Sequence, residues 1–401
     1  MPKSKGLKIL FPTARFIYPV IGGDRLKPYN ILSHLAKDHD VTLVSFYQGN
    51  EPPRAYIREV ESLGVKLHYI PLNPISAGVK TLLELPKKYP IEISYYLQKD
   101  FKKKVKKLQA EKNFDLGFAF FMRTAEYIKN MPFKKILMAE DCRTLYQKRS
   151  AQESSDLKQK FVRWWEYKKL KYYEPRIVEK FDSVTLVTNE DIASMQQQNP
   201  NPRYRLLTNG VDIDSFNPAE DAERSGILFA GKLDVWANVL MLKNIVRRIM
   251  PKILNEVPEA RLDIVGAKPA QEVKALAENN DFVTLTADVP DMQPYLQNAA
   301  LFLHPHSGGS GIQNKLLEAM ACGCPVVTSP TGNQGIYARH GIEAMIGDST
   351  DEFAEHTIKI LTDKELADTL SMKGRDLIVR THSWESVFEA TDEIIDEVMN
   401  D

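Results

Sequence analysis

A glycine-rich turn between two apolar segments holds the residue types that most directly suggest chemistry. Residues 300–304 have the composition of a short apolar strand, and residues 307–311 then contain three glycines in five positions. Apolar residues at helical spacing follow, and Gly323 stands where such a helix would end. Free N–H groups at a helix start form an anion site that the helix dipole strengthens. The turn predicts a phosphate-binding site, and a plain strand-to-helix connection is the alternative.

Charged and aromatic side chains accompany this turn. Lys315 lies in the first turn of the predicted helix and Glu318 near its middle, where a carboxylate can accept hydrogen bonds from two neighbouring hydroxyls, as on a ribose. His304 and His306 flank Pro305 at the edge of the turn. Two histidines are too few for a metal site. We expect each of them to donate a hydrogen bond to the turn or to a sugar, and we expect no metal here.

The composition is that of a soluble globular chain. Its 401 residues are 43% hydrophobic, and 53 basic residues balance 53 acidic ones, so net charge gives no reason to expect nucleic acid as a partner. The longest apolar runs are too short for a membrane span or a signal peptide. The cysteines at positions 142, 322 and 324 make no disulfide framework. These features predict a cytoplasmic protein.

Strand and helix segments alternate along the chain, which predicts α/β architecture with parallel, doubly wound sheets. The turn signals Asn209-Gly210 and Asn217-Pro218 separate two halves with the same alternation. Continuous helices are expected over residues 151–180 and 351–380. The expected strands are residues 7–11, 41–46, 65–70, 114–120, 135–139 and 183–187 in the first half, and 227–230, 261–265, 282–286, 301–304, 326–327 and 343–346 in the second.

The run GIQNKLLEAMACGCPVV at 311–327 resembles the donor-site segment of the large family of retaining GT-B glycosyltransferases, family four or group 1. Its Gly-Ile-Gln-Asn-Lys variant resembles a subgroup of exopolysaccharide-type sugar transferases. The resemblance implies two Rossmann-like domains around a cleft. It implies an acceptor domain over residues 1–206, a nucleotide-sugar donor domain over residues 207–381, and a C-terminal helix over residues 382–401 that returns to the first domain.

The resemblance also assigns roles to single positions. Glu318 matches the Glu that holds the nucleotide ribose, whereas Ser310 replaces a Glu that contacts the transferred sugar. Lys232 matches a basic residue that pairs with the donor diphosphate. Asn238 replaces a second lysine, for which Lys315 is a candidate substitute. Catalytic roles are expected for Asp141, Lys232 and Ser310, and donor contacts for Gly22, Gly23, Arg25, Asn238, His304, Gly309, Gly311, Ile312, Asn314, Lys315 and Glu318.

Two positions in the first half have an alternative reading. The Gly22-Gly23 loop with Arg25 resembles a loop that approaches the donor phosphates, but the glycines also suit a simple turn. Asp141 follows the expected strand 135–139. Its carboxylate could orient an acceptor hydroxyl or stabilise positive charge on the sugar ring, and it could equally cap the next helix.

The resemblance implies a retaining glycosyltransferase of surface polysaccharide or glycoconjugate synthesis. Its partners would be a nucleotide diphosphate sugar and a glycan or lipid-linked acceptor, with no cofactor and no metal. A nucleotide-sugar epimerase and a non-catalytic glycosyltransferase-like binding protein are the alternatives, since Ser310 and Asn238 replace charged residues. A dehydrogenase is disfavoured because no Gly-x-Gly-x-x-Gly follows the first strand.

A basic segment suggests one further partner. Lys99–Lys107 carries repeated lysines, with apolar residues at helical spacing at positions 101, 105 and 108. Such a helix can rest on an anionic membrane surface, which would make the protein peripheral at the inner face of the membrane. A solvated helix face is the alternative.

Overall fold

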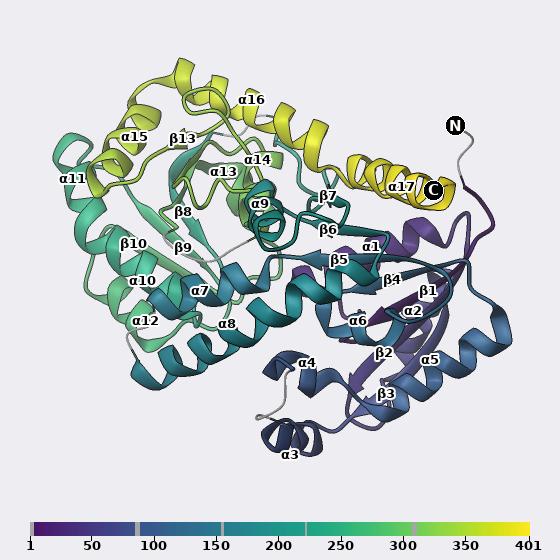
Figure 1. Cartoon of the computed structure of the whole chain (residues 1–401). Helices are drawn as coiled ribbons and strands as arrows, with labels where there is room; N and C mark the ends of the chain where they lie inside the picture. Colours follow the sequence, from purple (N-terminus) through teal and green to yellow (C-terminus); the bar gives the residue numbers. More distant parts are fainter. Residues whose placement is uncertain (1–3, 85–88, 154–155, 221–222, 307–310) are drawn as a thin grey trace. The chain divides into compact units, whose positions relative to one another are not determined.

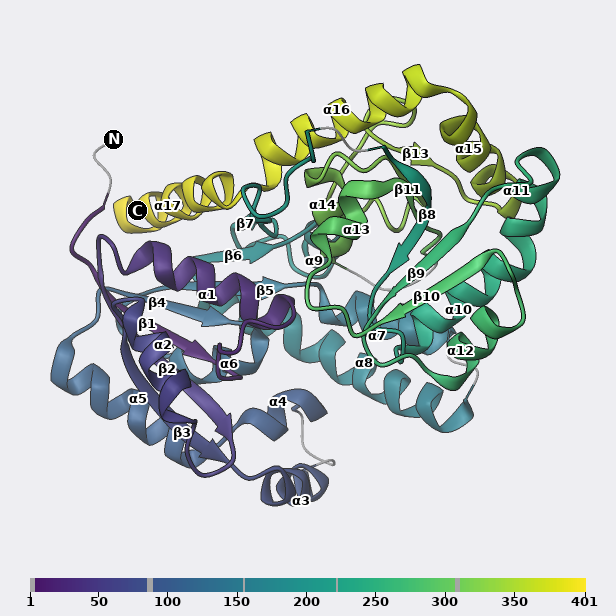
Figure 2. The same cartoon turned by 180° about the vertical axis from the view of Figure 1, so that it is seen from behind.

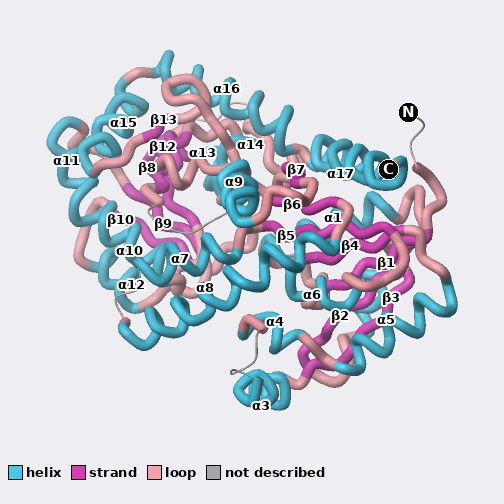
Figure 3. The backbone as a smooth tube through the Cα atoms, in the orientation of Figure 1, coloured by secondary structure: helices cyan, strands magenta, loops and turns pink. Residues whose placement is uncertain are grey.

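The computed structural model describes residues 4–84, 89–153, 156–220, 223–306 and 311–401. The chain divides into two compact units, Met1–Asn209 with Val387–Asp401 and Gly210–Ser386. In each unit the strands form one parallel sheet with helices packed against it (Figures 1 and 3). The predicted class, two doubly wound Rossmann-like α/β domains, is confirmed.

The first unit holds a seven-stranded sheet in the order β3-β2-β1-β4-β5-β6-β7. Its strands are β1 (Lys8–Thr13), β2 (Asp40–Gln48), β3 (Lys66–Leu72), β4 (Leu116–Phe120), β5 (Lys134–Glu140), β6 (Ser183–Leu186) and β7 (Tyr204–Leu206). Its helices are α1 (Gly23–Leu35), α2 (Arg54–Ser62), α3 (Pro74–Glu84), α4 (Ile91–Tyr96), α5 (Lys99–Lys112), α6 (Met122–Ile128), α7 (Arg143–Glu153), α8 (Leu157–Ile177), η1 (Val178–Lys180), α9 (Asn189–Gln198) and the greater part of α17 (Trp384–Asn400).

The second unit holds a six-stranded sheet in the order β10-β9-β8-β11-β12-β13. Its strands are β8 (Ser225–Ala230), β9 (Leu262–Gly266), β10 (Val283–Ala287), β11 (Ala299–His304), β12 (Val326–Thr328) and β13 (Met345–Ile346). Its helices are α10 (Trp236–Asn244), η2 (Ile245–Ile249), α11 (Met250–Glu256), α12 (Gln271–Glu278), α13 (Gln293–Asn298), α14 (Asn314–Ala321), α15 (Thr350–Thr362) and α16 (Lys364–His382).

Both sheets reverse their strand order at one point. The first strand of each unit has the second strand on one side and the fourth on the other, so the order reverses between β1 and β4 and between β8 and β11. Doubly wound sheets bind ligands outside the carboxyl ends of the strands at such a point. The loops after these four strands are therefore where a site is expected.

The C-terminal helix α17 belongs with the first unit along most of its length. His34 on α1 hydrogen-bonds Asp392 at 2.8 Å and stacks on Phe388 with ring centres 4.4 Å apart. Arg205 pairs with Glu397 at 2.8 Å. Figure 2 shows α17 beside α1. The two ends of the chain thus share the core of one unit.

Two helices that the sequence predicts as continuous are each two helices in the structure. The helix expected over residues 151–180 is the end of α7 followed by α8, which begins after Asp156, whose carboxylate accepts the N–H of Lys158. The helix expected over residues 351–380 is α15 and α16, separated at Asp363, whose carboxylate caps α16 at Leu366. In each case a capping carboxylate marks the start of the second helix, and apolar periodicity does not register such a cap.

The edge strand β7 is a further element absent from the sequence-based prediction, because its three residues show no alternation long enough to detect. No helix in the described ranges is long and apolar enough to cross a bilayer.

We predict that Gly266→Ala destabilises the second unit. A Cβ at Gly266 would lie 1.8 Å from the carbonyl oxygen of Gly231, so one of the two backbones would have to move. The free energy of unfolding in urea should fall by about 1–3 kcal/mol. Gly78→Ala on α3 is the matched control, because no atom lies within 4 Å of its added Cβ. Equal stability of the two variants would contradict the close backbone approach.

Candidate functional site

The reversal point of the second sheet brings together the two predicted donor-site segments. The loop after β8 contains Gly231 and Lys232, and the segment after β11 leads from His304 to α14. Strands β8 and β11 are parallel neighbours, so both segments leave the same edge of the sheet. Gly231 has φ of 156° and packs against Gly266, which keeps the loop close to the sheet. The strand positions match the sequence-based prediction here.

Asn238 links the two segments through its side-chain amide. Its Nδ2 donates to the carbonyl oxygen of Lys232 at 2.8 Å, and its Oδ1 accepts from Nζ of Lys315 at 3.3 Å. Asn238 is buried, whereas the Lys232 side chain is exposed. The ammonium of Lys315 therefore lies beside the position where the resembled family carries a second lysine. This geometry agrees with Lys315 as the substitute cation, and that role stays a prediction.

Lys315 and Glu318 are partly buried charges on the same face of α14. Burial lowers the pKa of Lys315 to about 8, although Glu318 opposes the shift, and it raises the pKa of Glu318 to about 7. Lys315 Nζ also lies 5.4 Å from the ring centre of Phe229. The carboxylate of Glu318 makes no hydrogen bond to a described residue, so it is available to hydroxyl donors. The two groups offer a cation and an acceptor one turn apart.

The start of α14 differs slightly from the prediction. The helix begins at Asn314, after Gln313 as its N-cap, and not directly behind Gly311. Gly311 has φ of 77°, a conformation that favours glycine, and Gly311 and Ile312 form the approach to the helix. Ser310 and Gly309 lie outside the described residues. The helix ends at Ala321, and Gly323 follows its C-cap with φ of 64°, as predicted.

Two arginines hold the far end of α14. Nη2 of Arg224 donates to the carbonyl oxygen of Cys322 at 2.7 Å, and Nη1 of Arg375 donates to that of Ala321. These cations satisfy carbonyl groups that a helix end leaves without partners and complement its dipole. They fix the direction in which the N-terminus of α14 points.

The two histidines stack at the carboxyl end of β11. Their ring centres are 5.2 Å apart, and His304 is fully buried. Burial, with Lys315 nearby, keeps the pKa of His304 well below its usual value and lowers that of His306 to about 4, so both rings are neutral at pH 7. Neither ring nitrogen of His304 has a hydrogen-bond partner in the described ranges. The ring keeps one donor and one acceptor for a ligand or a water.

The first-half candidates lie in the first unit. Gly22 has φ of 91° and is the N-cap of α1, so the Gly22-Gly23 pair opens that helix. Arg25 donates to the carbonyl oxygen of Pro19 at 3.1 Å. Asp141 directly follows β5 and pairs with Arg143 at 3.1 Å. The positions agree with the sequence, and their assigned roles stay predictions.

The sequence analysis missed a buried ion pair next to Asp141. Lys27, only 2% exposed, donates to Glu140 at 2.9 and 3.2 Å and to the carbonyl oxygen of Leu207 at 2.7 Å. Burial lowers the pKa of Lys27 and raises that of Glu140. The signal was present, because Lys27 falls on the same helix stripe as the buried Ile31 and Leu35.

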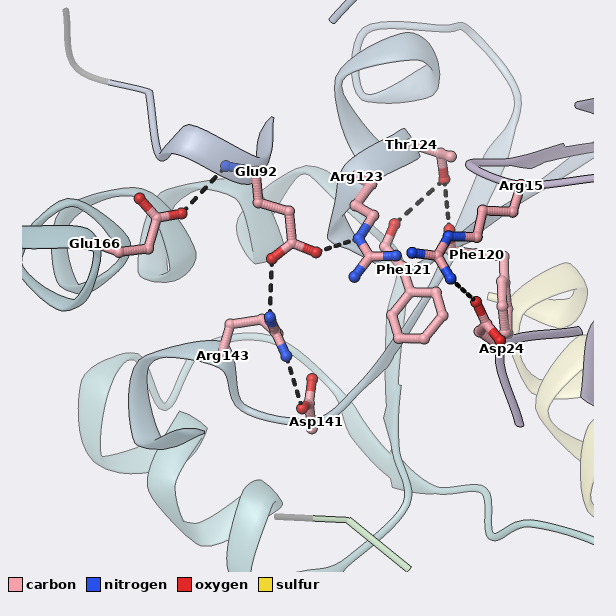
Figure 4. A network of polar contacts seen from close by, with 10 residues as sticks. All are labelled: Arg15, Asp24, Glu92, Phe120, Phe121, Arg123, Thr124, Asp141, Arg143 and Glu166. Atoms are coloured by element: carbon pink, nitrogen blue, oxygen red, sulfur yellow. Dashed lines mark hydrogen bonds and ion pairs between the residues drawn. The ribbon is translucent and has the colours of Figure 1, made fainter. Parts of the chain in front are cut away.

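A second network was also missed. Glu92 on α4 pairs with Nε of Arg123 and, at 2.9 Å, with Nη2 of Arg143, which in turn binds Asp141 (Figure 4). Burial alone would raise the pKa of Glu92, but the two arginines bring it below its usual value. No sequence motif unites these residues, since they come from α4, α6, α7 and the loop after β5.

The basic segment Lys99–Lys107 lies on α5. Its apolar residues Phe101, Val105 and Leu108 are buried in the core of the first unit, and its exposed lysines face solvent. The apolar face therefore supports the fold and is not open to a bilayer.

We predict a pH-dependent stability effect of Glu318→Gln. The pKa of Glu318 rises from 4.5 to about 7 on folding, so its stabilising contribution is present below pH 4.5 and is lost as pH rises through 7. Relative to wild type, the variant should gain on the order of 1–3 kcal/mol of unfolding free energy between pH 5 and 8. Urea unfolding at both pH values measures this. Glu278→Gln, an exposed control on α12, should show no such gain, and a flat difference for Glu318→Gln would refute burial of its charge.

Comparison with known proteins finds a family model that matches part of the second unit. Residues 224–363 match the family model described as glycosyl transferases group 1. These residues include Lys232, Asn238, Lys315 and Glu318.

Related proteins match other lengths of the chain. A Klebsiella pneumoniae protein described as an uncharacterized 44.6 kDa protein in the cps region is 23% identical over 88% of this chain and 90% of its own. A GDP-mannose-dependent alpha-(1-6)-phosphatidylinositol monomannoside mannosyltransferase of Mycobacterium tuberculosis is 26% identical over 53% of this chain and 61% of its own.

A solved structure confirms the fold over the whole chain. Anabaena HepE in complex with UDP and glucose has a TM-score of 0.66 and 14% identity over 97% of this chain and 99% of its own. The fold is that of the GT-B glycosyltransferases, as predicted from the donor-site segment.

Proposed function

We propose, on the premise that residues 224–363 form a group 1 glycosyl transferase domain, that this protein transfers a sugar from a nucleotide diphosphate sugar to a glycan or lipid-linked acceptor with retention of configuration. The observation that carries the proposal is the contact between Lys315 and Asn238 beside the loop of Lys232. It supports a cationic diphosphate site at the reversal point of the sheet.

The proposed mechanism uses charge at the leaving group. The bond from the anomeric carbon to the diphosphate oxygen breaks, the carbon bonds to the acceptor oxygen, and the acceptor hydroxyl proton passes to the diphosphate oxygen that leaves. Lys232, Lys315 and the N–H groups at the start of α14 stabilise the negative charge that develops on the diphosphate. Glu318 accepts hydrogen bonds from the ribose. Asp141 orients the acceptor hydroxyl, and no metal is needed.

The printed names of the relatives suggest the first donors to test. The mannosyltransferase suggests GDP-mannose, and a second structure of HepE, in complex with UDP-glucose, suggests UDP-glucose. The cps relative supports a role in surface polysaccharide synthesis. We place the reaction in the cytoplasm, in agreement with three free buried cysteines.

The decisive experiment mixes the pure protein with a panel of nucleotide sugars, with and without acceptors. Product formation only with an acceptor supports the transferase, and the NMR coupling of the new anomeric proton tests retention. An altered sugar without acceptor would indicate an epimerase, and nucleotide binding without turnover a binding protein. Undiminished activity in EDTA would support metal independence, and loss that Mg²⁺ restores would refute it.

We predict that three variants separate the ribose and diphosphate contacts. Glu318→Ala should weaken the binding of nucleoside and of nucleoside diphosphate alike, by on the order of 1–3 kcal/mol, because the ribose hydroxyls lose a hydrogen-bond acceptor. Lys232→Ala and Lys315→Ala should weaken binding of the nucleoside diphosphate by a similar amount and leave binding of the nucleoside almost unchanged. Calorimetry with GDP, UDP and their nucleosides measures this.

Lys274→Ala on α12 is the matched control for these variants, since its side chain is exposed. Wild-type diphosphate affinity in both lysine variants would place the diphosphate elsewhere.

We also propose a contact of α5 with anionic membrane, through charge alone. Because its apolar face is buried, reversing the exposed Lys102, Lys103, Lys106 and Lys107 to Glu should reduce vesicle binding only at low salt. Sedimentation with vesicles that contain phosphatidylglycerol measures this. Equal vesicle binding by variant and wild type would contradict the membrane contact and favour the alternative, in which this face of α5 is only solvated.

A further inference from the structure

The first unit contains a pocket of about 650 Å³ to which the proposal above assigns no ligand. It is lined from the loop after β1 and from α4, α6, α7 and α8, and its lining includes Arg15, Glu92, Tyr95, Tyr96, Arg123 and Glu166. Arg15 follows β1 and Arg123 follows β4, so the pocket lies at the reversal point of the first sheet. That is the place where doubly wound sheets bind ligands.

Two guanidinium groups meet in this pocket. Arg15 and Arg123 point toward one another in Figure 4, and both contact Tyr96. Arg123 is only 17% exposed and uses Nε for Glu92, while its terminal nitrogens make no hydrogen bond to a described residue. Arg15 uses one terminal nitrogen for Asp24 at 2.7 Å. The two arginines keep donors in the fork geometry that matches phosphate oxygens.

The carboxylates in the lining are already satisfied. Glu92 accepts from Arg123 and Arg143. Glu166 accepts the N–H groups of Ile91 and Glu92 at 2.8 and 3.2 Å (Figure 4 draws the bond to Glu92). Neither therefore needs the free donors of the arginines.

Lys158 and Arg163 add positive charge to the lining, and in the described ranges neither forms an ion pair. The side chains of the lining that still have hydrogen-bond donors or charge without a partner are cationic, so the pocket suits an anion.

An apolar surface begins at the same pocket. Val162 lines the pocket and is 52% exposed, and Leu157 and Phe161 on the same helix are 81% and 60% exposed. Leu157 and Phe161, four positions apart, share one side of α8, and Val162 lies next to that side, toward the pocket. An occupant with a charged head and an apolar tail matches both parts of this surface.

We propose that this pocket binds the phosphate of a phosphate-bearing acceptor, with Arg15 and Arg123 as its direct ligands. The inference rests on the proposed transferase function and specifies its acceptor class. The phosphate could belong to a lipid phosphate, whose chain would lie along the apolar side of α8, or to a soluble sugar phosphate. Both present the same anion to the two arginines.

The test measures binding of farnesyl phosphate, farnesol and glucose 6-phosphate by calorimetry, without any nucleotide sugar. Arg15→Gln and Arg123→Gln should each weaken farnesyl phosphate binding roughly tenfold or more, since each removes charge-assisted hydrogen bonds. Arg123→Lys keeps the charge without the fork and should lose part of the affinity. Arg58→Gln, an exposed control on α2, should bind as wild type. Farnesol should bind more weakly than its phosphate.

The outcomes divide as follows. Tighter binding of farnesyl phosphate than of glucose 6-phosphate assigns a lipid phosphate, and comparable binding assigns a soluble one. Wild-type affinity in both glutamine variants, equal binding of farnesol, or no binding of either phosphate overturns the proposal. Circular dichroism confirms folding, and Arg15→Gln is the safer variant because Arg15 is half exposed. If the pocket proposal is wrong, the protein can still turn over a nucleotide sugar. If the transferase proposal is wrong, the pocket can still bind phosphate, so the two failures are distinguishable.

Discussion

The reversal of strand order in each sheet is the constraint on which the two sites depend. A parallel sheet that is wound in both directions from its first strand sends two neighbouring loops to opposite sides, which opens a crevice at the carboxyl edge. In the second unit these loops carry Lys232 and lead to Lys315, and in the first they carry Arg15 and lead to Arg123. The same arrangement therefore produces a cationic site twice, from unrelated local sequences.

Buried charged groups in this protein differ in how completely they are paired, and this difference distinguishes structural groups from those we assign to ligands. Lys27 and Glu140 satisfy one another and a backbone carbonyl, so they hold α1 to the end of β5. Within the described ranges, the ammonium of Lys315 has one hydrogen-bond partner, the amide oxygen of Asn238, and the terminal nitrogens of Arg123 have none. A buried charge without full pairing is costly, and an anionic ligand removes that cost. The incompletely paired cations are accordingly the ones we assign to ligands.

The Asn238 substitution illustrates how one cation can be supplied from another element. The amide adds no charge, but it donates to the loop backbone and accepts from Lys315. The ammonium is thereby held beside the loop by a residue on a neighbouring helix. A lysine at position 238 would place two ammonium groups in contact, so the amide and Lys315 suit one another.

The sequence alone predicted every strand of the two sheets except β7, the glycine at each end of the α14 segment and the charged residues on that helix. It could do so because burial on both faces produces apolar runs, and because Gly311 and Gly323 occupy positive φ. It also placed Lys232 after β8, where the resembled family carries a basic residue, and Asn238 six positions on, where that family carries a second lysine.

Only the tertiary structure decided which distant residues meet. The contact of Lys315 with Asn238 joins positions 77 residues apart, and the arginines around Glu92 come from α6 and α7. The boundaries between α7 and α8 and between α15 and α16 depend on single caps that leave apolar periodicity unchanged. Local patterns report which side of an element is buried, but the partner of a buried charge depends on how the elements pack, and no local pattern contains that information.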